Sequence, residues 1–316
     1  MSAAAGNGAS RPKYLIAGAT GVIGRRLAQA LVDDGAEVRA IVRDPDRART
    51  ILPSEVELFN ADLTTDDDLA SAMEGVALAY FLVHMMGTDD GYADAENAAA
   101  EKFATAASEA GVDRVVYLGG LGADEGGSPH LDSRHHTAEA LRRTGPPLTY
   151  FRAAMIISPG SESYELLRSI AQRLPALPRT DWLSSSTQPI GIRDVVAYLR
   201  SAPLVPESEG REIQIGGPDV LPHLEVIAQF SRETGRSPAR LVPVPDGIAS
   251  PGMVAAGAAS VTSGNPLVAH ELALGLSGDT KVEDTSGMEL FSVEPEPLNV
   301  AIQRALAEEE KVNSDG

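Results

Sequence analysis

The sequence contains no cysteine among its 316 residues. This absence excludes disulfide bonds, thiolate catalysis and cysteine-bound zinc or iron–sulfur clusters. Positive charge is also scarce, because 26 lysines and arginines face 45 acidic residues and leave a net charge of −19. Such a charge repels the phosphates of nucleic acid and the anionic surface of a bilayer, so we expect neither nucleic acid nor a membrane as a partner.

Long apolar runs are missing as well. No uninterrupted apolar stretch approaches the roughly 18 residues that a membrane-spanning helix needs. Residues 1–12 are rich in Ala, Gly and Ser and lack the basic and apolar regions of a signal peptide. We therefore expect a disordered N-terminus over 1–12 and a cytoplasmic protein. A hydrophobic content of 43% is enough for one large α/β domain.

Short apolar runs alternate with helical patterns through the first half of the chain. The run at 13–17 precedes a glycine turn and a segment with apolar residues at helical spacing, up to residue 34. The alternation continues, with strands expected at 38–42, 56–60, 78–83, 114–118 and 148–152 and helices at 93–110 and 133–143. Repeated βαβ units predict an α/β fold with a doubly wound parallel Rossmann sheet.

The pattern changes beyond residue 160. An amphipathic helix is expected at 163–174, and a stretch containing Pro and Ser follows it. We therefore expect a Rossmann domain over 13–160 and a smaller C-terminal substrate lobe or lid over 161–300. Within the latter, residues 190–217 or so are expected to return to the Rossmann body. Residues 301–316 are expected to form an acidic, solvated C-terminal tail.

A glycine signature follows the first expected strand and opens the first helix. Gly18, Gly21 and Gly24 have the spacing G-x-x-G-x-x-G. In this context one glycine makes the turn, another lets the backbone approach a pyrophosphate, and the third lets helix and strand pack closely. A purely structural turn is the alternative, and the strand–turn–helix context favours dinucleotide binding. The loop residues predicted to bind the cofactor are Gly18, Ala19, Thr20, Gly21, Val22, Ile23 and Gly24.

The end of the second expected strand bears on the choice between NADP(H) and NAD(H). An acid there bonds the ribose hydroxyl of NAD, whereas an arginine accepts the additional phosphate of NADP. Arg43 occupies this position and Asp44 follows it, so NADP(H) is preferred and NAD(H) stays open; a solvated surface pair is the alternative. Asp62 and Leu63, after the third strand, are expected to contact the adenine, with helix capping by Asp62 as the alternative.

Five further blocks carry a family resemblance: Tyr80–His84, Val115–Gly120, Ser133–Arg134, Phe151–Ala154 and Gln188–Asp194. With the glycine loop, they resemble the atypical short-chain dehydrogenase/reductases, in particular the NmrA-like and complex-I-subunit-like NAD(P)-binding branch. The likeness extends from residue 13 to about residue 284, and it implies the Rossmann fold and an NAD(P)H-dependent oxidoreductase. The implied cofactor contacts in these blocks are Leu82, Val83, Leu118, Gly119 and Arg152. For Arg152 a structural ion pair is the alternative.

The chain departs from this family at the catalytic triad. Typical members use a Tyr-x-x-x-Lys pair and a Ser or Thr after the fifth strand to protonate and orient a carbonyl. None of the seven tyrosines is followed four positions later by lysine, and Gly119, Gly120 and Leu121 stand where the hydroxyl residue is expected. Hydride transfer depends mainly on the cofactor, so only the proton source changes. Water or a hydroxyl group of the substrate is then the expected proton source.

Other side chains are candidates for catalytic roles. His84 closes the fourth strand, and His130, Ser133 and His135 lie where the family begins its catalytic helix. A packed histidine at a strand end and helix capping by Ser133 are the alternatives. The spacing of the histidines does not suit a metal site, so no metal is expected.

These features favour an NADPH-dependent ketoreductase that acts on a small-molecule carbonyl substrate. The substrate is expected to be bulky, such as an aromatic or polyketide-type secondary metabolite of antibiotic biosynthesis. The competing hypothesis is a non-catalytic NAD(P)-sensing regulator or assembly factor, as NmrA-like proteins can be. Both hypotheses require cofactor binding, and only the first requires turnover.

Overall fold

The computed structural model describes residues 11–65, 68–84, 92–122, 129–243 and 278–314. Nearly all of the segment predicted to be a disordered N-terminus, and the stretch at 244–277 within the predicted lobe, lie outside these ranges. None of the helices in the described ranges is both long and apolar enough to cross a membrane.

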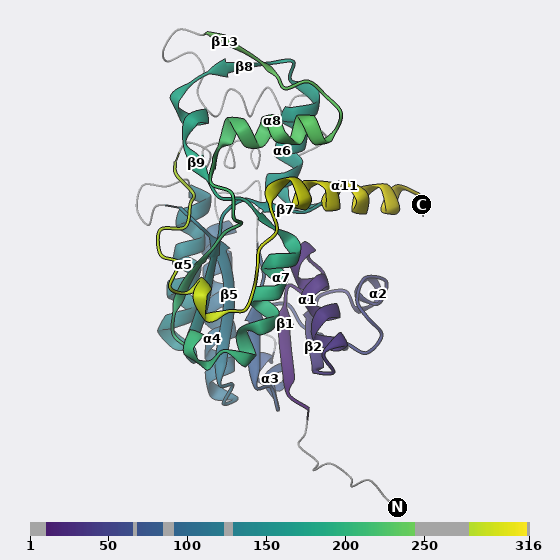
Figure 1. The fold of residues 1–316 in the computed structure, drawn as a ribbon. Helices are drawn as coiled ribbons and strands as arrows, with labels where there is room; N and C mark the ends of the chain where they lie inside the picture. The colour runs from purple at the N-terminus through teal and green to yellow at the C-terminus, as the bar shows by residue number, and fades with distance from the viewer. Residues whose placement is uncertain (1–10, 66–67, 85–91, 123–128, 244–277, 315–316) are drawn as a thin grey trace, which may run out of the picture.

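A parallel sheet of seven strands forms the centre of the molecule (Figure 1). Its order is β11-β6-β5-β4-β1-β2-β3, and every neighbouring pair is parallel. The strands are β1 (Lys13–Ala17), β2 (Glu37–Val42), β3 (Glu57–Asn60), β4 (Leu78–Phe81), β5 (Arg114–Gly120), β6 (Leu148–Ala153) and β11 (Glu212–Ile215). The chain reverses its direction of travel across the sheet between β3 and β4, so the predicted doubly wound Rossmann sheet is confirmed.

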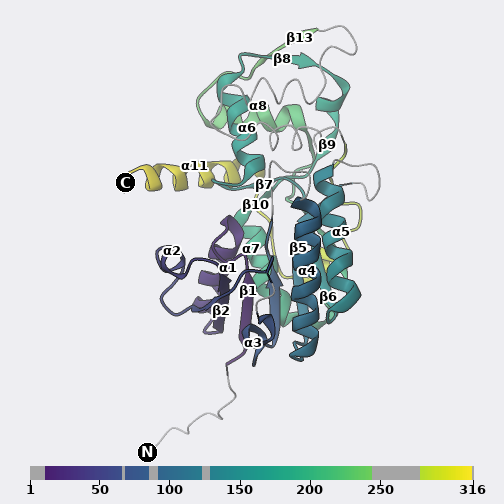
Figure 2. The same cartoon turned by 180° about the vertical axis from the view of Figure 1, so that it is seen from behind.

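Helices cover both faces of this sheet (Figures 1 and 2). One face packs against α1 (Val22–Asp33), α2 (Pro45–Arg49) and α7 (Ile192–Ser201). The other face packs against α3 (Leu69–Met73), α4 (Tyr92–Glu109) and α5 (Pro129–Thr144). Central strands are therefore buried on both faces, which explains why β1 reads as an uninterrupted apolar run and not as an alternating one.

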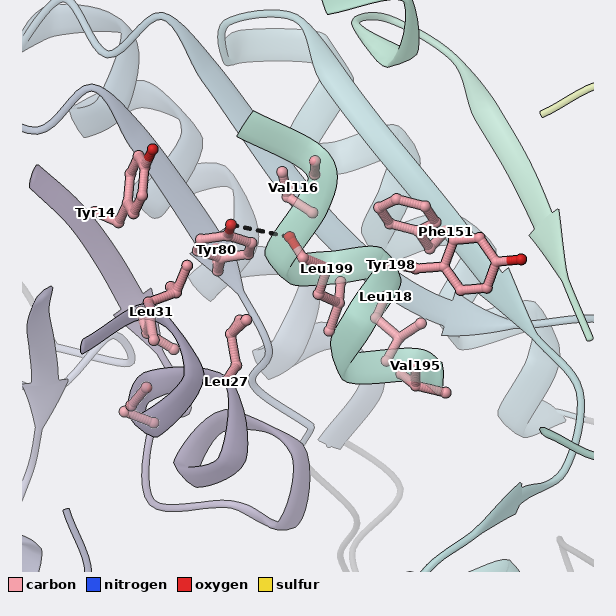
Figure 3. Packing of buried hydrophobic residues seen from close by; sticks show 14 of the residues in the cluster. Tyr14, Leu27, Leu31, Tyr80, Val116, Leu118, Phe151, Val195, Tyr198 and Leu199 are labelled. Atoms are coloured by element: carbon pink, nitrogen blue, oxygen red, sulfur yellow. Dashed lines mark hydrogen bonds between the residues drawn. The ribbon is translucent and has the colours of Figure 1, made fainter. Parts of the chain in front are cut away.

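Tyrosines are part of the core between the sheet, α1 and α7 (Figure 3). Tyr80 of β4 is fully buried, and its hydroxyl donates a hydrogen bond of 3.0 Å to the carbonyl oxygen of Leu199 in α7. Tyr14 of β1 meets the ring of Tyr80 edge to face, with centroids 6.4 Å apart. The hydroxyl of Tyr80 is thus satisfied inside the core and is not available to a ligand.

A smaller lobe lies beyond the carboxyl ends of the sheet strands (Figure 1). Its core consists of apolar side chains from α6, α8 and the last helix, α11. The lobe contains the paired strands β7–β10, β9–β12 and β8–β13. Its elements are β7 (Ile156–Ile157), α6 (Glu162–Arg173), β8 (Ala176–Arg179), β9 (Ser186–Thr187), β10 (Ile190–Gly191), β12 (Leu221–Pro222), α8 (His223–Glu233) and β13 (Arg240–Pro243). Short 3₁₀ turns lie at η1 (Asp181–Ser184), η2 (Ala202–Leu204), η3 (Pro206–Ser208) and η4 (Met288–Leu290).

Helix α11 (Leu298–Ser314) stands where an acidic tail was predicted. Leu298 and Ile302 lie one turn apart and are buried in the core of the lobe. Further along, Glu308 forms an ion pair with Arg26 of α1. The prediction of a solvated tail is therefore wrong for residues 301–309, because apolar residues at helical spacing and the arginine partners of Glu308 and Glu309 hold this part of the helix against the body. Glu310, Lys311 and Ser314 are exposed.

Asp194 of α7 fixes the segment that leads into α11. Its side chain is buried, and one carboxylate oxygen accepts the backbone N–H of Glu296 at 3.1 Å. Burial raises the pKa of Asp194 to about 6, although the hydrogen bond from Glu296 acts in the opposite direction. An acid whose pKa is higher in the folded chain than in the unfolded chain opposes folding once it is ionised.

The variant Asp194→Asn is expected to be more stable than the parent chain above pH 6. The ionised carboxylate lowers the free energy of unfolding of the parent chain. This loss grows as the pH rises from 3.8, the ordinary pKa, to about 6, the pKa in the folded chain. The variant should therefore gain about 1–3 kcal/mol in free energy of unfolding near pH 8. Urea unfolding at a series of pH values measures this gain, which should vanish below the lower limit of that interval. A gain that stays constant with pH would contradict the raised pKa.

Candidate cofactor and substrate site

A cavity of about 670 Å³ lies at the carboxyl ends of the sheet strands, next to the lobe. Its walls come from the segments after β1, β2, β3, β4, β5 and β6, from the start of α6 and from the first residue of α8. Ligands of doubly wound sheets bind at this edge, where the strand order reverses. The volume is within the range of small-molecule sites.

The glycine loop forms one wall of this cavity. Gly18 has φ +84°, and a Cβ there would lie 2.5 Å from the carbonyl oxygen of Leu82. A Cβ on Gly24 would overlap the carbonyl oxygen of Gly18, so this glycine allows α1 to pack on the end of β1. The first turn of α1 carries no acidic residue and no side-chain cap. Its backbone N–H groups therefore suit an anion such as a pyrophosphate.

Six of the seven loop residues predicted to bind the cofactor line the cavity: Gly18, Thr20, Gly21, Val22, Ile23 and Gly24. Ala19 is the exception. It is fully buried and packs in the core with Leu27 of α1. Its side chain therefore supports the loop from behind and does not face a ligand.

Of the two residues that follow β2, Arg43 lines the cavity and Asp44 does not. Arg43 is exposed and lines the cavity, and within the described ranges its guanidinium forms no hydrogen bond or ion pair. Asp44 caps α2 instead, because its carboxylate accepts the N–H of Arg47 at 3.0 Å. The arrangement fits the additional phosphate of NADP better than the free ribose hydroxyl of NAD.

Asp62 and Leu63 also line the cavity, next to Thr64. One carboxylate oxygen of Asp62 accepts the N–H and the hydroxyl of Thr64, at 2.9 and 2.8 Å, and so shapes the turn after β3. The N-cap of α3 is Asp68, whose carboxylate accepts the N–H of Ser71 at 3.2 Å. The alternative of helix capping by Asp62 was therefore wrong.

The ends of β4 and β5 supply Leu82, Val83, Leu118 and Gly119 to the cavity wall, so these four predicted cofactor contacts are accessible to a ligand. A Cβ on Gly119 would lie 2.7 Å from the hydroxyl oxygen of Tyr150 and 2.8 Å from its ring. This position therefore has no room for the serine that the family uses. Within the described ranges no tyrosine lines the cavity either.

His84 lies on the cavity wall directly after β4, backed by a buried acid. Its Nδ1 is 3.3 Å from a carboxylate oxygen of Glu96, a fully buried residue of α4. The other oxygen of Glu96 accepts the hydroxyl of Thr137 at 3.2 Å and lies 3.7 Å from the guanidinium of Arg134. Burial and the positive charge of Arg134 lower the pKa of His84, although Glu96 opposes this shift. His84 is therefore a neutral imidazole held in a fixed orientation near pH 7.

Two of the catalytic candidates on α5, Ser133 and His135, do not line the cavity. The helix begins at Pro129, so Ser133 lies inside it and is not the predicted N-cap. Ser133 is buried, and its carbonyl oxygen accepts the hydroxyl of Thr137 at 3.0 Å. His135 lies 3.7 Å from Glu139 in an i,i+4 pair. Neither side chain lines the cavity, and no catalytic role is assigned to them here.

The same helix sends two other residues to the cavity. Leu131 and Arg134 are one turn apart and both line it. Arg134 also lies over the ring of Tyr117, 5.9 Å from its centroid. His130 belongs to the first turn of α5, and its side chain is outside the part of the chain that the structure describes.

Arg152 lies outside the cavity and contacts the segment that forms the cavity wall after β5. It is 5% exposed, does not line the cavity and forms an ion pair of 2.8 Å with Glu212 of β11. It also donates hydrogen bonds to the carbonyl oxygens of Gly120, at 3.2 Å, and Gly122. The geometry favours the structural alternative over the predicted cofactor contact, because the guanidinium holds the chain in place after β5.

Two cavity residues from the distal part of the chain were not predicted. His223, the first residue of α8, and Thr280 both line the cavity opposite the Rossmann loops. Neither belongs to a recognisable motif, and each lies well over 100 residues from the glycine loop. Only the folded arrangement of the lobe brings them to the site.

Comparison with known proteins identifies the cofactor-binding part of the chain. Residues 18–174 match the model of an NAD(P)H-binding family. The chain is 28% identical over 230 residues to a (4-alkanoyl-5-oxo-2,5-dihydrofuran-3-yl)methyl phosphate reductase of Streptomyces griseus, covering 70% of this chain and 74% of the relative. It is 29% identical over 255 residues to a ceramide reductase of Caulobacter vibrioides, covering 79% and 77%.

A solved structure of similar fold is the triphenylmethane reductase of a Citrobacter species in complex with NADP(H). The TM-score is 0.73 at 20% identity, over 92% of this chain and 99% of that one. This likeness supports the fold, while the family match covers the glycine loop, Arg43 and the ends of β4 and β5. Residues 18–174 thus form the NAD(P)H-binding domain that the sequence predicts, and the chain shares its fold with this reductase.

Proposed function

We propose that this NAD(P)H-dependent reductase uses NADPH to reduce a ketone on a bulky small molecule of aromatic or polyketide type. When bound, the cofactor supplies a hydride to the carbonyl carbon; a proton from water or from a substrate hydroxyl completes the alcohol. The observation that carries the proposal is a cavity with a dinucleotide cradle at one end and a lobe with its own apolar core at the other. The two bacterial relatives, both named as reductases, support the same class of reaction.

The proton source follows from the residues around the cavity. A general acid must be protonated at the working pH and able to give its proton up. His84 is neutral near pH 7 because its pKa is lowered, so it is a poor proton donor and better suited to orient a water or a substrate hydroxyl. The absence of a tyrosine from the described cavity wall leaves the solvent and the substrate as sources.

Tyr150 provides the strictest test of this assignment, because its hydroxyl lies directly behind Gly119. Burial raises the pKa of Tyr150, which makes its ionisation unfavourable. The variant Tyr150→Phe is therefore expected to keep kcat within about threefold of the parent, whereas loss of a true proton donor costs about 10²- to 10⁴-fold. Initial rates of NADPH oxidation measure the effect. A loss of a hundredfold or more in a variant that still binds NADPH would reassign the proton donor to Tyr150.

The second candidate function is a non-catalytic NAD(P) sensor or assembly factor. The observation that favours it is that Gly119 stands in place of a serine and that no tyrosine lines the described part of the cavity wall. NADPH absorbance, followed with a panel of aryl and cyclic ketones, separates the two functions. The reductase predicts NADPH oxidation matched by an equal amount of alcohol. Tight binding of both redox forms without oxidation by any ketone would favour the sensor.

A further inference from the structure

His223 lies where the main cavity meets a second, smaller one. The smaller cavity, of about 40 Å³, shares His223, Met155 and Ser163 with the main cavity. Its remaining walls are the aliphatic side chains of Leu166, Leu167, Ile170, Val226 and Ile227. The two cavities together form one site with a wide main part and a small extension whose walls are largely aliphatic.

The imidazole of His223 is a buried polar group, and its contact with the backbone of Gly278 falls short of a hydrogen bond of normal geometry. The residue is 3% exposed, and neither ring nitrogen makes a hydrogen bond of normal geometry within the described part of the chain. Buried polar side chains almost always have a partner, because an unmet one is costly. A ring placed on a cavity wall without such a partner therefore points to a partner supplied by the ligand.

The protonation state of His223 defines what it can bind. Burial lowers its pKa to about 4, and the nearby backbone of Gly278 and the carboxylate of Asp279 only partly oppose this shift. The ring is therefore neutral near pH 7, with one N–H donor and one acceptor nitrogen. A neutral ring suits a carbonyl or hydroxyl oxygen and does not attract an anionic group.

The small cavity limits what can lie beside that oxygen. Its own walls are aliphatic, so it offers few hydrogen bonds to a water and instead favours an apolar group. Its small volume and aliphatic walls suit a short aliphatic chain.

We propose that His223 hydrogen-bonds an oxygen of the substrate while a short aliphatic chain beside that oxygen occupies the small cavity. The substrate class is then a ketone with an n-alkyl or acyl arm on a bulkier body. This inference rests on the proposed function, because it assumes that the substrate shares the main cavity with the cofactor. It assigns a specificity-determining role to His223 and to the apolar walls of the small cavity.

The test uses full-length protein and four aryl ketones that differ only in chain length: acetophenone, propiophenone, butyrophenone and valerophenone. Calorimetry gives the Kd of each ketone for the NADP⁺ complex, and NADPH oxidation gives kcat/KM. The parent chain should prefer an intermediate chain length. His223→Ala should weaken binding of every ketone by about tenfold and leave NADPH binding unchanged. His223→Asn, which keeps a donor and an acceptor, should recover part of the loss.

Two further variants make the result specific. Ile227→Val removes one methylene from the wall of the small cavity, so the preferred chain should lengthen, at a modest cost in stability of the fold. His136→Ala, at an exposed residue of α5 away from the cavity, should behave like the parent. Equal affinity of His223→Ala and the parent for all four ketones, with no chain-length preference, would overturn the inference. Chain-dependent binding that needs His223 without NADPH oxidation would support it and overturn the ketoreductase function instead.

Discussion

Replacement of Arg43 by alanine is expected to weaken NADPH binding by about 10- to 100-fold and to leave NADH binding nearly unchanged. The reason is the arrangement at the end of β2, where the guanidinium of Arg43 lines the cavity while the carboxylate of Asp44 caps α2. A charge-assisted bond to the additional phosphate exists only with NADPH, so only that cofactor loses it. Calorimetric titration of the variant with both cofactors measures the difference.

Arg47→Ala is the matched control for this prediction. Arg47 is also an exposed arginine near the end of β2, but its side chain does not line the cavity. The control should retain the affinities of the parent chain for both cofactors, which excludes a general effect of positive charge in this strongly acidic protein. If Arg43→Ala weakened NADH and NADPH equally, Arg43 would not be the phosphate-binding residue.

Replacement of Gly18 by alanine is expected to abolish detectable NADPH binding and to lower the free energy of unfolding by about 2–5 kcal/mol. Two causes add up at this position. The backbone has φ +84°, which is costly for a residue with a Cβ, and the new Cβ would meet the carbonyl oxygen of Leu82 at 2.5 Å. The turn must then shift, and the N–H groups at the start of α1 move with it. Urea unfolding and NADPH titration measure the two effects.

Gly35→Ala separates strain from crowding. Gly35 has φ +81°, almost the same as Gly18, but no atom lies within 4 Å of its Cβ position. We expect this control to lose only about 1–2 kcal/mol and to bind NADPH like the parent chain. Equal losses in both variants would mean that the close approach of Gly18 to β4 is unimportant.

The parts of the site that could be predicted from the sequence are those with local chemistry. The glycine loop is recognisable because a tight turn, a close backbone approach and a helix start occur within seven residues. Arg43 is recognisable because it is the first residue after β2, the position that contacts the ribose of the cofactor in such folds. The doubly wound sheet follows from repeated apolar runs, each long enough for one buried strand.

The start of α5 and the existence of α11 were missed although the sequence carries signals for both. Pro129 opens α5, and proline is favoured in the first turn of a helix because its missing N–H costs nothing there. In α11 the many acidic residues suggest a solvated segment, whereas the spacing of Leu298 and Ile302 indicates an apolar helix face. Net charge predicts solvation of a segment only when no apolar stripe runs along it.

The role of His223 could not be predicted, because its surroundings are assembled from distant segments. The burial that lowers its pKa comes from packing of α6 and α8 near the sheet edge. No short sequence motif indicates this packing. The sequence shows that a glycine stands at position 119 where a serine is expected. The reason for the glycine is the ring of Tyr150 on the neighbouring strand, which comes close only in the folded chain.

We propose that the first turn of α1 and Arg43 together hold NADP(H). Titration calorimetry of the unmodified chain with NADPH tests this most directly. We expect saturable binding of one NADPH per chain, tighter than the binding of NADH under the same conditions. No saturable heat with NADPH, or tighter binding of NADH, would contradict it.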